Sequence, residues 1–305
     1  MSSQRTDLAA TLRAAIWMTG AIASFTAMAI AGRAVSFALD TFEIMFYRSL
    51  IGILIVGTVA FGTGKWREVT GRNLGLHFGR NLAHFAGQNL WFFAITVIPL
   101  AQVFALEFTT PIWVILLSPI FLAEPIRKAG VIAAVMGFAG ILIVARPSPE
   151  SLNIGILAAA LSAVCFAFTA VFTRRLTRTE TITCILVYLT TMQAVFGFIF
   201  SGYDGDIALP DPTTAPWLVL IGCAGLLAHF CLTNALRIAP ASIVMPIDFA
   251  RLPVIAIVGA LFYSEPLDAL VFLGAALIFA GNWINITRSE EHTSELQSQF
   301  RISYA

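Results

Sequence analysis

Long apolar stretches, each about the length of a membrane-crossing helix, follow one another along nearly the whole chain. A helix that crosses the roughly 30 Å hydrocarbon layer of a bilayer needs about 20 mainly apolar residues. Ten stretches meet this requirement, at 15–33, 42–62, 74–96, 100–122, 128–146, 153–173, 181–202, 216–237, 241–263 and 268–287. The pattern therefore predicts an all-α fold with ten transmembrane helices. Prolines within 100–122 permit a kink in that helix.

Composition supports the same class. Of the 305 residues, 58% are hydrophobic and 11% are charged, whereas soluble proteins carry about 25% charged residues. These values exclude an ordinary soluble domain and predict an integral membrane protein whose main partner is the lipid bilayer. The net charge of +1 gives the chain no general attraction to nucleic acid.

The distribution of lysine and arginine predicts the orientation. If residues 1–14 form a cytoplasmic N-terminus, most of the 18 basic residues fall in cytoplasmic loops, and among loop residues only Arg33 and Arg146 fall outside. Such a bias is the positive-inside rule, and it places both termini in the cytoplasm. The apolar run Ile16–Gly32 follows two arginines, as in a signal peptide, but it is long enough to span and we expect an uncleaved first helix.

An internal repeat divides the chain into residues 15–146 and 147–288. The two halves align without gaps at one constant offset, which matches Arg33 with Arg174, Pro99 with Pro240, and Glu124-Pro125 with Glu265-Pro266. Each half holds five predicted helices, and because five is odd the second half enters the membrane inverted. We therefore predict two inverted five-helix repeats with a site between them.

Residues 289–305 form a polar tail, unlike the apolar chain before them. Its stretch SEEHTSELQSQ resembles translated sequencing-adaptor sequence, and we expect it not to belong to the native fold.

Polar residues inside the predicted helices recur at equivalent positions of the two halves. Gln88 corresponds to His229, and Glu107 corresponds to Asp248. Their depth suggests that Gln88 meets Glu107 near the outer end of one cavity and that His229 meets Asp248 near the inner end. One interpretation is a pathway whose carboxylates bind a cationic or zwitterionic solute or couple transport to protons. The other is a pair of buried hydrogen bonds between neighbouring helices.

The third predicted helix carries a polar stripe. Helical steps of three and four residues place on one face the residues His77, Asn81, His84, Gln88 and Trp91. Such a face points to protein or water rather than lipid. The stripe is either part of the pathway or a set of interhelical hydrogen bonds. His77 is expected at the inner interface, and Trp91 either stacks on a substrate ring or belongs to the interfacial aromatic belt.

Three arginines lie within predicted helices. Arg48 either lines the pathway or forms a helix-end ion pair with Glu43, and Arg80 is expected to extend its charge to the inner surface. Arg251 shares a helical face with Asp248 in the segment PIDFARLP. It either neutralises that acid or binds an anionic group of the substrate.

Several stretches resemble the drug/metabolite transporter superfamily, in its EamA-type family. FEIMFYRSLIG, FTTPIWVILLSPIFLAEP, GFAGILIVARP and PASIVMPIDFARLPVIAIVGALFYSEP carry the likeness, which covers about residues 10–288. The resemblance implies a multi-pass carrier for small metabolites in a bacterial inner membrane, with the pathway residues Arg48, Asn81, His84, Gln88, Trp91, Glu107, His229, Asp248 and Arg251 as candidates.

The predicted function is secondary transport of a small organic metabolite by alternating access. The chain has no Walker loop, so ATP is not the direct energy source. It has no HExxH or GxSxG motif, and we predict no enzyme activity and no cofactor. Its four cysteines lack CxxC spacing and its four histidines lack ligand spacing, so we predict neither a disulfide nor a metal site. An intramembrane enzyme or a receptor-like protein that uses the same buried polar residues is the alternative.

Overall fold

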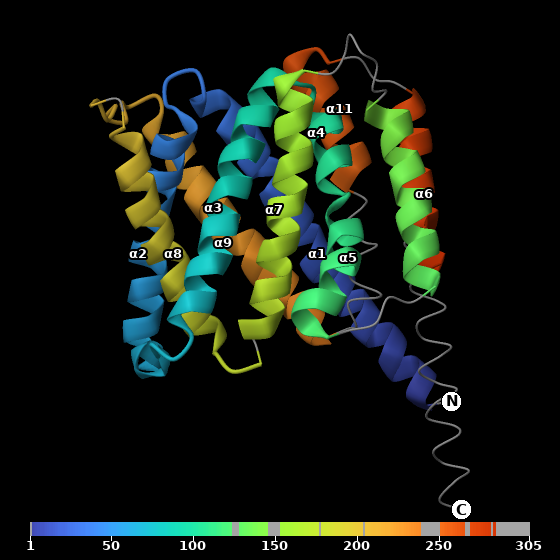
Figure 1. Cartoon of the computed structure of the whole chain (residues 1–305), viewed down its shortest axis with the longest axis horizontal. Helices are drawn as coiled ribbons and strands as arrows, with labels where there is room; N and C mark the ends of the chain where they lie inside the picture. Colours follow the sequence, from blue (N-terminus) through green and yellow to red (C-terminus); the bar gives the residue numbers. More distant parts are fainter. Residues whose placement is uncertain are drawn as a thin grey trace, which may run out of the picture.

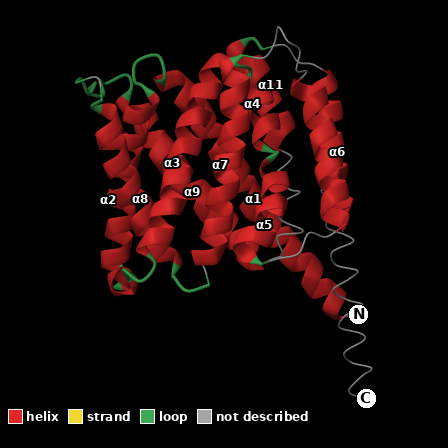
Figure 2. Ribbon diagram, in the orientation of Figure 1, coloured by secondary structure: helices red, strands yellow, loops and turns green. Residues whose placement is uncertain are grey.

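The computed structural model describes residues 2–123, 128–145, 153–176, 178–203, 205–238, 251–265, 269–281 and 283–284. These residues form helices joined by short turns, and no strand occurs among them (Figure 2). The helices are α1 (Ser2–Val35), α2 (Thr41–Gly62), η1 (Lys65–Glu68), α3 (Leu74–Val97), α4 (Leu100–Glu107), α5 (Thr110–Leu122), α6 (Lys128–Ala145), α7 (Ile154–Leu176), α8 (Ile182–Ser201), α9 (Ala215–Ile238) and α11 (Arg251–Tyr263).

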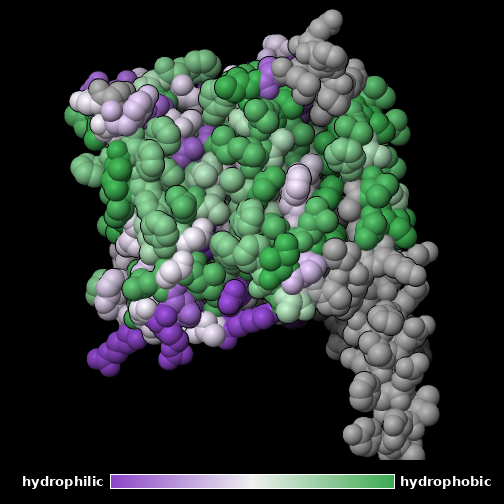
Figure 3. All heavy atoms as spheres, in the orientation of Figure 1, coloured by the Kyte–Doolittle hydropathy of each residue, from purple (hydrophilic) through white to green (hydrophobic). Residues whose placement is uncertain are grey.

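The long helices run side by side as a bundle (Figure 1). Six spans among the described residues are long and apolar enough to cross a membrane, and Val135–Val144, Arg251–Tyr263 and Ala269–Gly281 are shorter apolar helices. Large apolar side chains point outward, as with Leu54 and Leu261, and the flank in Figure 3 is mostly hydrophobic while hydrophilic residues gather at its lower edge. The chain is therefore a multi-pass membrane protein, as the sequence predicted.

The fourth predicted span is broken rather than continuous. α4 ends at Glu107, and α5 begins at Thr110. Pro111 lies in the first turn of α5, where a residue without an N–H is tolerated but cannot continue the hydrogen bonds of the preceding helix. Irregular backbone at membrane depth occurs where protein or a cavity surrounds it, and this break places Glu107 at the end of a half-helix.

The tightest helix pairs join the first half of the sequence to the second. α1 packs along α9, α3 along α7, and α2 along α8, while α4 contacts α11. In the repeat alignment α1 corresponds to α7 and α3 to α9, so the first two pairs are equivalent to each other. α2 and α8 correspond to each other, and α11 corresponds to α5.

One further contact between the halves brings two backbones together. A Cβ added to Gly140 of α6 would lie 2.7 Å from the carbonyl oxygen of Gly274, and a Cβ added to Gly274 would lie 2.6 Å from the carbonyl oxygen of Gly140. Only residues without a side chain permit this approach, which is a common way for membrane helices to pack closely.

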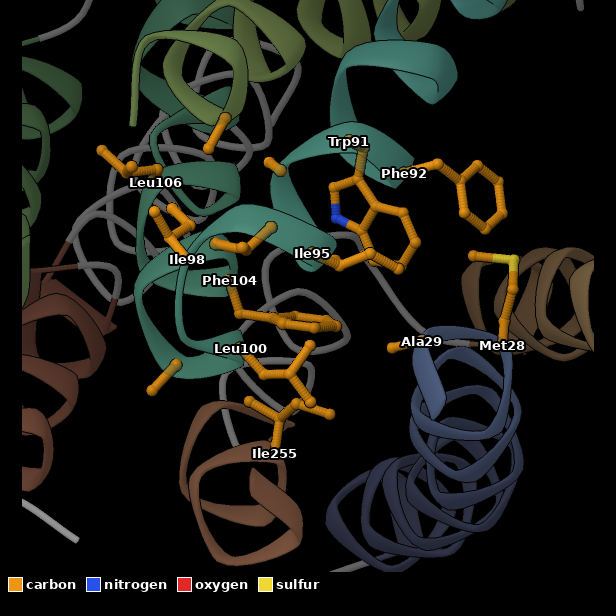
Figure 4. Packing of buried hydrophobic residues seen from close by; sticks show 14 of the residues in the cluster. Met28, Ala29, Trp91, Phe92, Ile95, Ile98, Leu100, Phe104, Leu106 and Ile255 are labelled. Atoms are coloured by element: carbon orange, nitrogen blue, oxygen red, sulfur yellow. The ribbon is translucent and has the colours of Figure 1, made fainter. Parts of the chain in front are cut away.

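The hydrophobic core lies where α1, α3, α4 and α11 converge. Figure 4 shows Met28 of α1, Trp91 of α3, Phe104 of α4 and Ile255 of α11 pointing into the same region. Phe104 and Ile255 are completely buried, and Met28 is 4% exposed. This core surrounds the polar residues described next, so they sit in a water-poor environment.

Candidate functional site

The polar stripe of α3 is buried throughout. His77 and Asn81 are fully buried, and His84, Gln88 and Trp91 are at most 6% exposed. The stripe therefore faces protein and not lipid, as predicted. His77 lies in the first turn of α3 and protein covers it completely, and its place at the inner interface stays a prediction. The aromatic-belt interpretation of Trp91 was wrong, because neighbouring helices leave its side chain only 2% exposed and a belt residue faces lipid.

Asn81 links α3 to α8 through hydrogen bonds. Its side-chain nitrogen donates to the backbone carbonyl oxygen of Tyr188 at 3.3 Å, and its backbone carbonyl oxygen accepts from the side-chain nitrogen of Gln193 at 2.8 Å. Arg80 donates to the Asn81 side chain at 2.8 Å and to the Thr173 hydroxyl at 3.1 Å. Arg80 thus turns inward instead of extending to the surface, because Thr173 of α7 and Asn81 of α3 supply acceptors close by.

Arg48 reaches across to α3 and contacts Gln88. Its Nη1 donates a hydrogen bond to Gln88 Oε1. Gly225 of α9 makes room for the guanidinium, since a Cβ at that position would lie 3.1 Å from Arg48 Nη2. The expected pair with Glu43 does not form. Glu43 instead completes a capping box with Asp40 at the start of α2.

A small cavity lies beside Arg48 in the interior of the bundle. Side chains from α2, α3, α8 and α9 line it, among them Arg48, His84, Gln193 and His229. Its volume is about 20 Å³, which is room for about one water molecule. The ring of His84 lies 6.3 Å from the ring of His229, and both His84 ring nitrogens lack a hydrogen-bond partner among the described residues.

A second polar group sits at the break between α4 and α5. Glu107 accepts hydrogen bonds from Trp91 Nε1 at 2.9 Å and from Arg251 Nη2 at 3.1 Å. The Arg251 and Glu107 side chains are 5% and 17% exposed, so the ion pair is largely buried. A carboxylate at the C-terminal end of a half-helix is unfavourable next to the helix dipole, and these two donors offset that cost.

Aromatic rings surround the Arg251 guanidinium. Its central carbon lies 4.7 Å from the ring centre of Phe25, 5.0 Å from that of Phe104 and 5.1 Å from that of Phe108. These distances are within the range of cation–π attraction. The rings come from α1, from α4 and from the residue after α4, so Arg251 is held by three segments of the first half of the chain.

Phe25 connects the two polar groups. Its ring lies 5.8 Å from the His229 ring in an edge-to-face arrangement, and the same residue contacts Arg251. Arg48, Gln88, His84, His229, Arg251 and Glu107 therefore form one buried band across the interior, lined by aromatic rings. This band can offer hydrogen bonds and charge to a solute, and its rings can stack on a flat one.

The predicted contact between Gln88 and Glu107 was wrong. Gln88 contacts Arg48, while Glu107 at the end of α4 contacts Trp91 and Arg251 of α11. Asp248, the repeat equivalent of Glu107, lies outside the described residues, so its expected contacts with His229 and with Arg251 stay predictions.

The sequence analysis did not predict an ion pair at the C-terminal end of α1. Arg33 donates to Glu265, to the carbonyl oxygen of Ile98 at 2.9 Å and to that of Ile95. Its guanidinium also lies 4.6 Å from the ring centre of Tyr263. Arg33 and Glu265 both appeared in the repeat alignment, and that alignment was the available signal for them.

Comparison with known proteins decides the family. The profile described as "EamA-like transporter family" matches residues 12–146 and 153–287. The chain belongs to the EamA-like transporter family. This membership confirms the resemblance seen in the sequence, and the family is one of membrane transporters.

Several named relatives support the assignment. A "Riboflavin transporter" of Brucella anthropi is 32% identical over 82% of this chain and 89% of its own length. A "Riboflavin transporter" of Vibrio cholerae is 26% identical over 88% and 90%. An "S-adenosylmethionine uptake transporter" of Rickettsia felis is 26% identical over 86% and 88%.

A solved structure titled "Crystal structure of protein" matches 89% of this chain and 95% of its own chain with a TM-score of 0.65 and 19% identity. At that identity the match supports the fold alone. The EamA-like fold therefore has an experimental counterpart over nearly the whole chain, and the buried band lies within the matched family region.

Proposed function

We propose that this EamA-like protein is a secondary transporter of the bacterial inner membrane that moves a flat heteroaromatic metabolite, with riboflavin as the leading candidate. It works by alternating access with two inverted five-helix repeats, and both termini lie in the cytoplasm. The helix pairing supports the repeat, because α1 against α9 and α3 against α7 are equivalent contacts across a pseudo-two-fold axis.

The state described is closed at the outer end. In the proposed orientation Arg33 and Glu265 lie on the external side, where the pair ties α1 and the α3–α4 turn to the residues that follow α11. The cavity of about 20 Å³ is far too small for a vitamin-sized solute, whose pockets measure about 300–1,000 Å³. Loading therefore requires the two halves to move apart, which is the motion that alternating access supplies.

The aromatic and cationic band is the observation that carries the substrate class. Riboflavin has a flat ring system with carbonyl oxygens and ring nitrogens, joined to a chain of hydroxyl groups. Trp91, Phe25 and Phe104 offer stacking surfaces, while Arg48 and Arg251 offer donors for carbonyl oxygens. The relatives named as riboflavin transporters support the same class.

S-adenosylmethionine is the second candidate because a relative is named for its uptake. Its adenine ring suits the same aromatic surfaces, but its sulfonium group is a permanent cation. Arg48, Arg80 and Arg251 all lie within or beside the band, and Glu107 is the described carboxylate that pairs with one of them. The positive field of these arginines favours the neutral vitamin.

The test uses purified protein in liposomes and follows flavin fluorescence. We expect riboflavin uptake that unlabelled riboflavin inhibits. Arg48→Met should reduce this uptake at least tenfold, while Arg67→Met, an exposed arginine in η1, should not change it. Uptake of S-adenosylmethionine without riboflavin uptake would select the second candidate, and uptake of neither would refute the substrate class.

Proton coupling is part of the proposal because titratable His84 and His229 line the cavity beside the route. A proton gradient directed into the liposomes, with the outside more acidic, should then increase riboflavin uptake. Equal uptake with and without the gradient, in vesicles that hold the gradient, would show facilitated diffusion instead.

A further inference from the structure

A group of metal-ligating residues lies away from the transport band. It consists of His77 in the first turn of α3, Glu180 in the α7–α8 connection and Cys184 in the first turn of α8. Their ligand atoms all lie within 4.8 Å of one another. In Figure 1 the start of α3 and the α7–α8 connection lie at the lower end of the bundle, opposite the end where α4 and α11 are labelled.

No hydrogen bond among the described residues compensates for the burial of the His77 imidazole. Its side chain is fully buried, yet both ring nitrogens lack a hydrogen-bond partner among the described residues. A buried polar group without a partner costs about 1–3 kcal/mol. The ring of Tyr188 lies 4.3 Å from the imidazole ring and fixes its orientation, so the imidazole is held in place with its nitrogens unused.

Glu180 is prepared to act as an anionic ligand. It accepts hydrogen bonds from Asn73 Nδ2 at 2.7 Å and from Thr70 Oγ1 at 2.8 Å. Burial raises the pKa of Glu180, but these hydrogen bonds outweigh that effect and the pKa stays below its ordinary value. The side chain is half-buried, which leaves a route from solvent to the group.

Cys184 supplies the soft ligand. Its side chain is fully buried, and its sulfur lies 3.7 Å from the carbonyl oxygen of Thr70. That carbonyl oxygen accepts a hydrogen bond from the thiol, so it is a nearby oxygen that could also bind a metal. Nitrogen, sulfur and oxygen donors together suit Zn²⁺, which binds His, Cys and Glu at about 2.0–2.3 Å in tetrahedral geometry.

We propose that His77, Glu180 and Cys184 form a Zn²⁺ site that clamps α3 to α8 near the predicted cytoplasmic end. Thr70 or a water molecule completes the tetrahedron, and the ligand atoms draw about 1 Å closer to reach bonding distance. Because α3 and α8 belong to different halves of the chain, bound Zn²⁺ restrains their separation at this end. The site is independent of the transported solute.

This site departs from the expectation that the chain binds no metal. The ligands come from positions 77, 180 and 184, so two of them are one helical turn apart and the third lies in the other half of the sequence. No short sequence motif predicts such an arrangement. The three residues come together because α3 packs against α8.

The test measures Zn²⁺ binding to purified full-length protein without a histidine tag, after removal of metals with a chelator. We expect one Zn²⁺ per chain and a rise in Tm on adding Zn²⁺. Cys184→Ser and His77→Gln should weaken binding at least tenfold. The matched control is Cys223→Ser, an exposed cysteine in α9, which should bind as the unaltered protein does.

A measurement on the unaltered protein makes the result independent of how well the variants fold. Co²⁺ added in place of Zn²⁺ should give the thiolate-to-metal charge-transfer band of a tetrahedral cysteine-bound cobalt. Absence of that band, or equal Zn²⁺ affinity in Cys184→Ser and the unaltered protein, would overturn the proposal.

Discussion

Replacing Glu107 with glutamine tests the buried ion pair most directly. The Arg251 and Glu107 atoms lie 3.1 Å apart, and at an effective dielectric constant of about 20 this separation corresponds to about 5 kcal/mol of Coulomb attraction. Desolvation of both groups cancels part of that attraction. Removing one partner of a buried pair therefore costs about 3–5 kcal/mol, most of it from the charge left behind.

The assay compares Glu107→Gln, Arg251→Met and the double variant Glu107→Gln/Arg251→Met by thermal unfolding and by riboflavin uptake. We expect both single variants to lose several degrees of Tm and most uptake. The double variant should regain at least half of the lost stability, because both charges of the pair are then removed, while its uptake stays low. If the single variants keep both stability and transport, the pair has neither role. If the double variant regains transport, the pair is only structural.

Three further outcomes follow from other contacts. Glu265→Gln weakens the outer ion pair, so external maleimide should label a cysteine introduced at Leu106 faster than in the parent, and unchanged labelling would contradict an outer lock. Gly140→Ala places a methyl group 2.7 Å from a backbone oxygen and should cost about 1–3 kcal/mol of stability. Its control Gly57→Ala meets nothing within 4 Å and should add about 0.5–1 kcal/mol. Hydrogen bonds from Thr213 and Thr214 lower the pKa of Asp211 to about 2, so its stabilising effect is complete above its ordinary pKa and is lost as the pH falls through about 2. Asp211→Asn should therefore lower the Tm at neutral pH, with the difference from the parent shrinking in acid, and a pH-independent difference would be the contrary result.

Much of the architecture was accessible from the sequence, because apolar length and polar stripes have direct structural meaning. The positions of α2 and α8 followed from hydropathy, and the burial of the α3 stripe followed from helical spacing. The break between α4 and α5 did not, since Pro111 indicates a kink but does not tell whether the helix bends or stops. That outcome depends on whether neighbouring helices offer partners to the freed backbone.

The pairing within the site was beyond sequence reasoning for a related reason. Gln88, Glu107 and Arg251 were recognised as buried polar residues from their depth in apolar stretches. Which of them touch depends on helix rotation and on the break between α4 and α5, neither of which is encoded in spacing. The repeat alignment nevertheless identified the equivalence of Glu107 with Asp248, the acid near Arg251 in the sequence, and Glu107 forms an ion pair with Arg251.

The polar face of α3 has a consequence for how the protein is made. α2 is apolar enough to enter the bilayer with Arg48, but α3 is not among the helices that qualify as spans by hydropathy. During synthesis, Arg48 is made before its hydrogen-bond partner Gln88. Arg80 and Asn81 are made long before their partners Thr173 and Tyr188. α3 therefore leaves the translocon with its donors unmatched until α7 and α8 follow. A chain that stops before α7 would present these groups to lipid, a defect of the kind that membrane-protein quality control recognises.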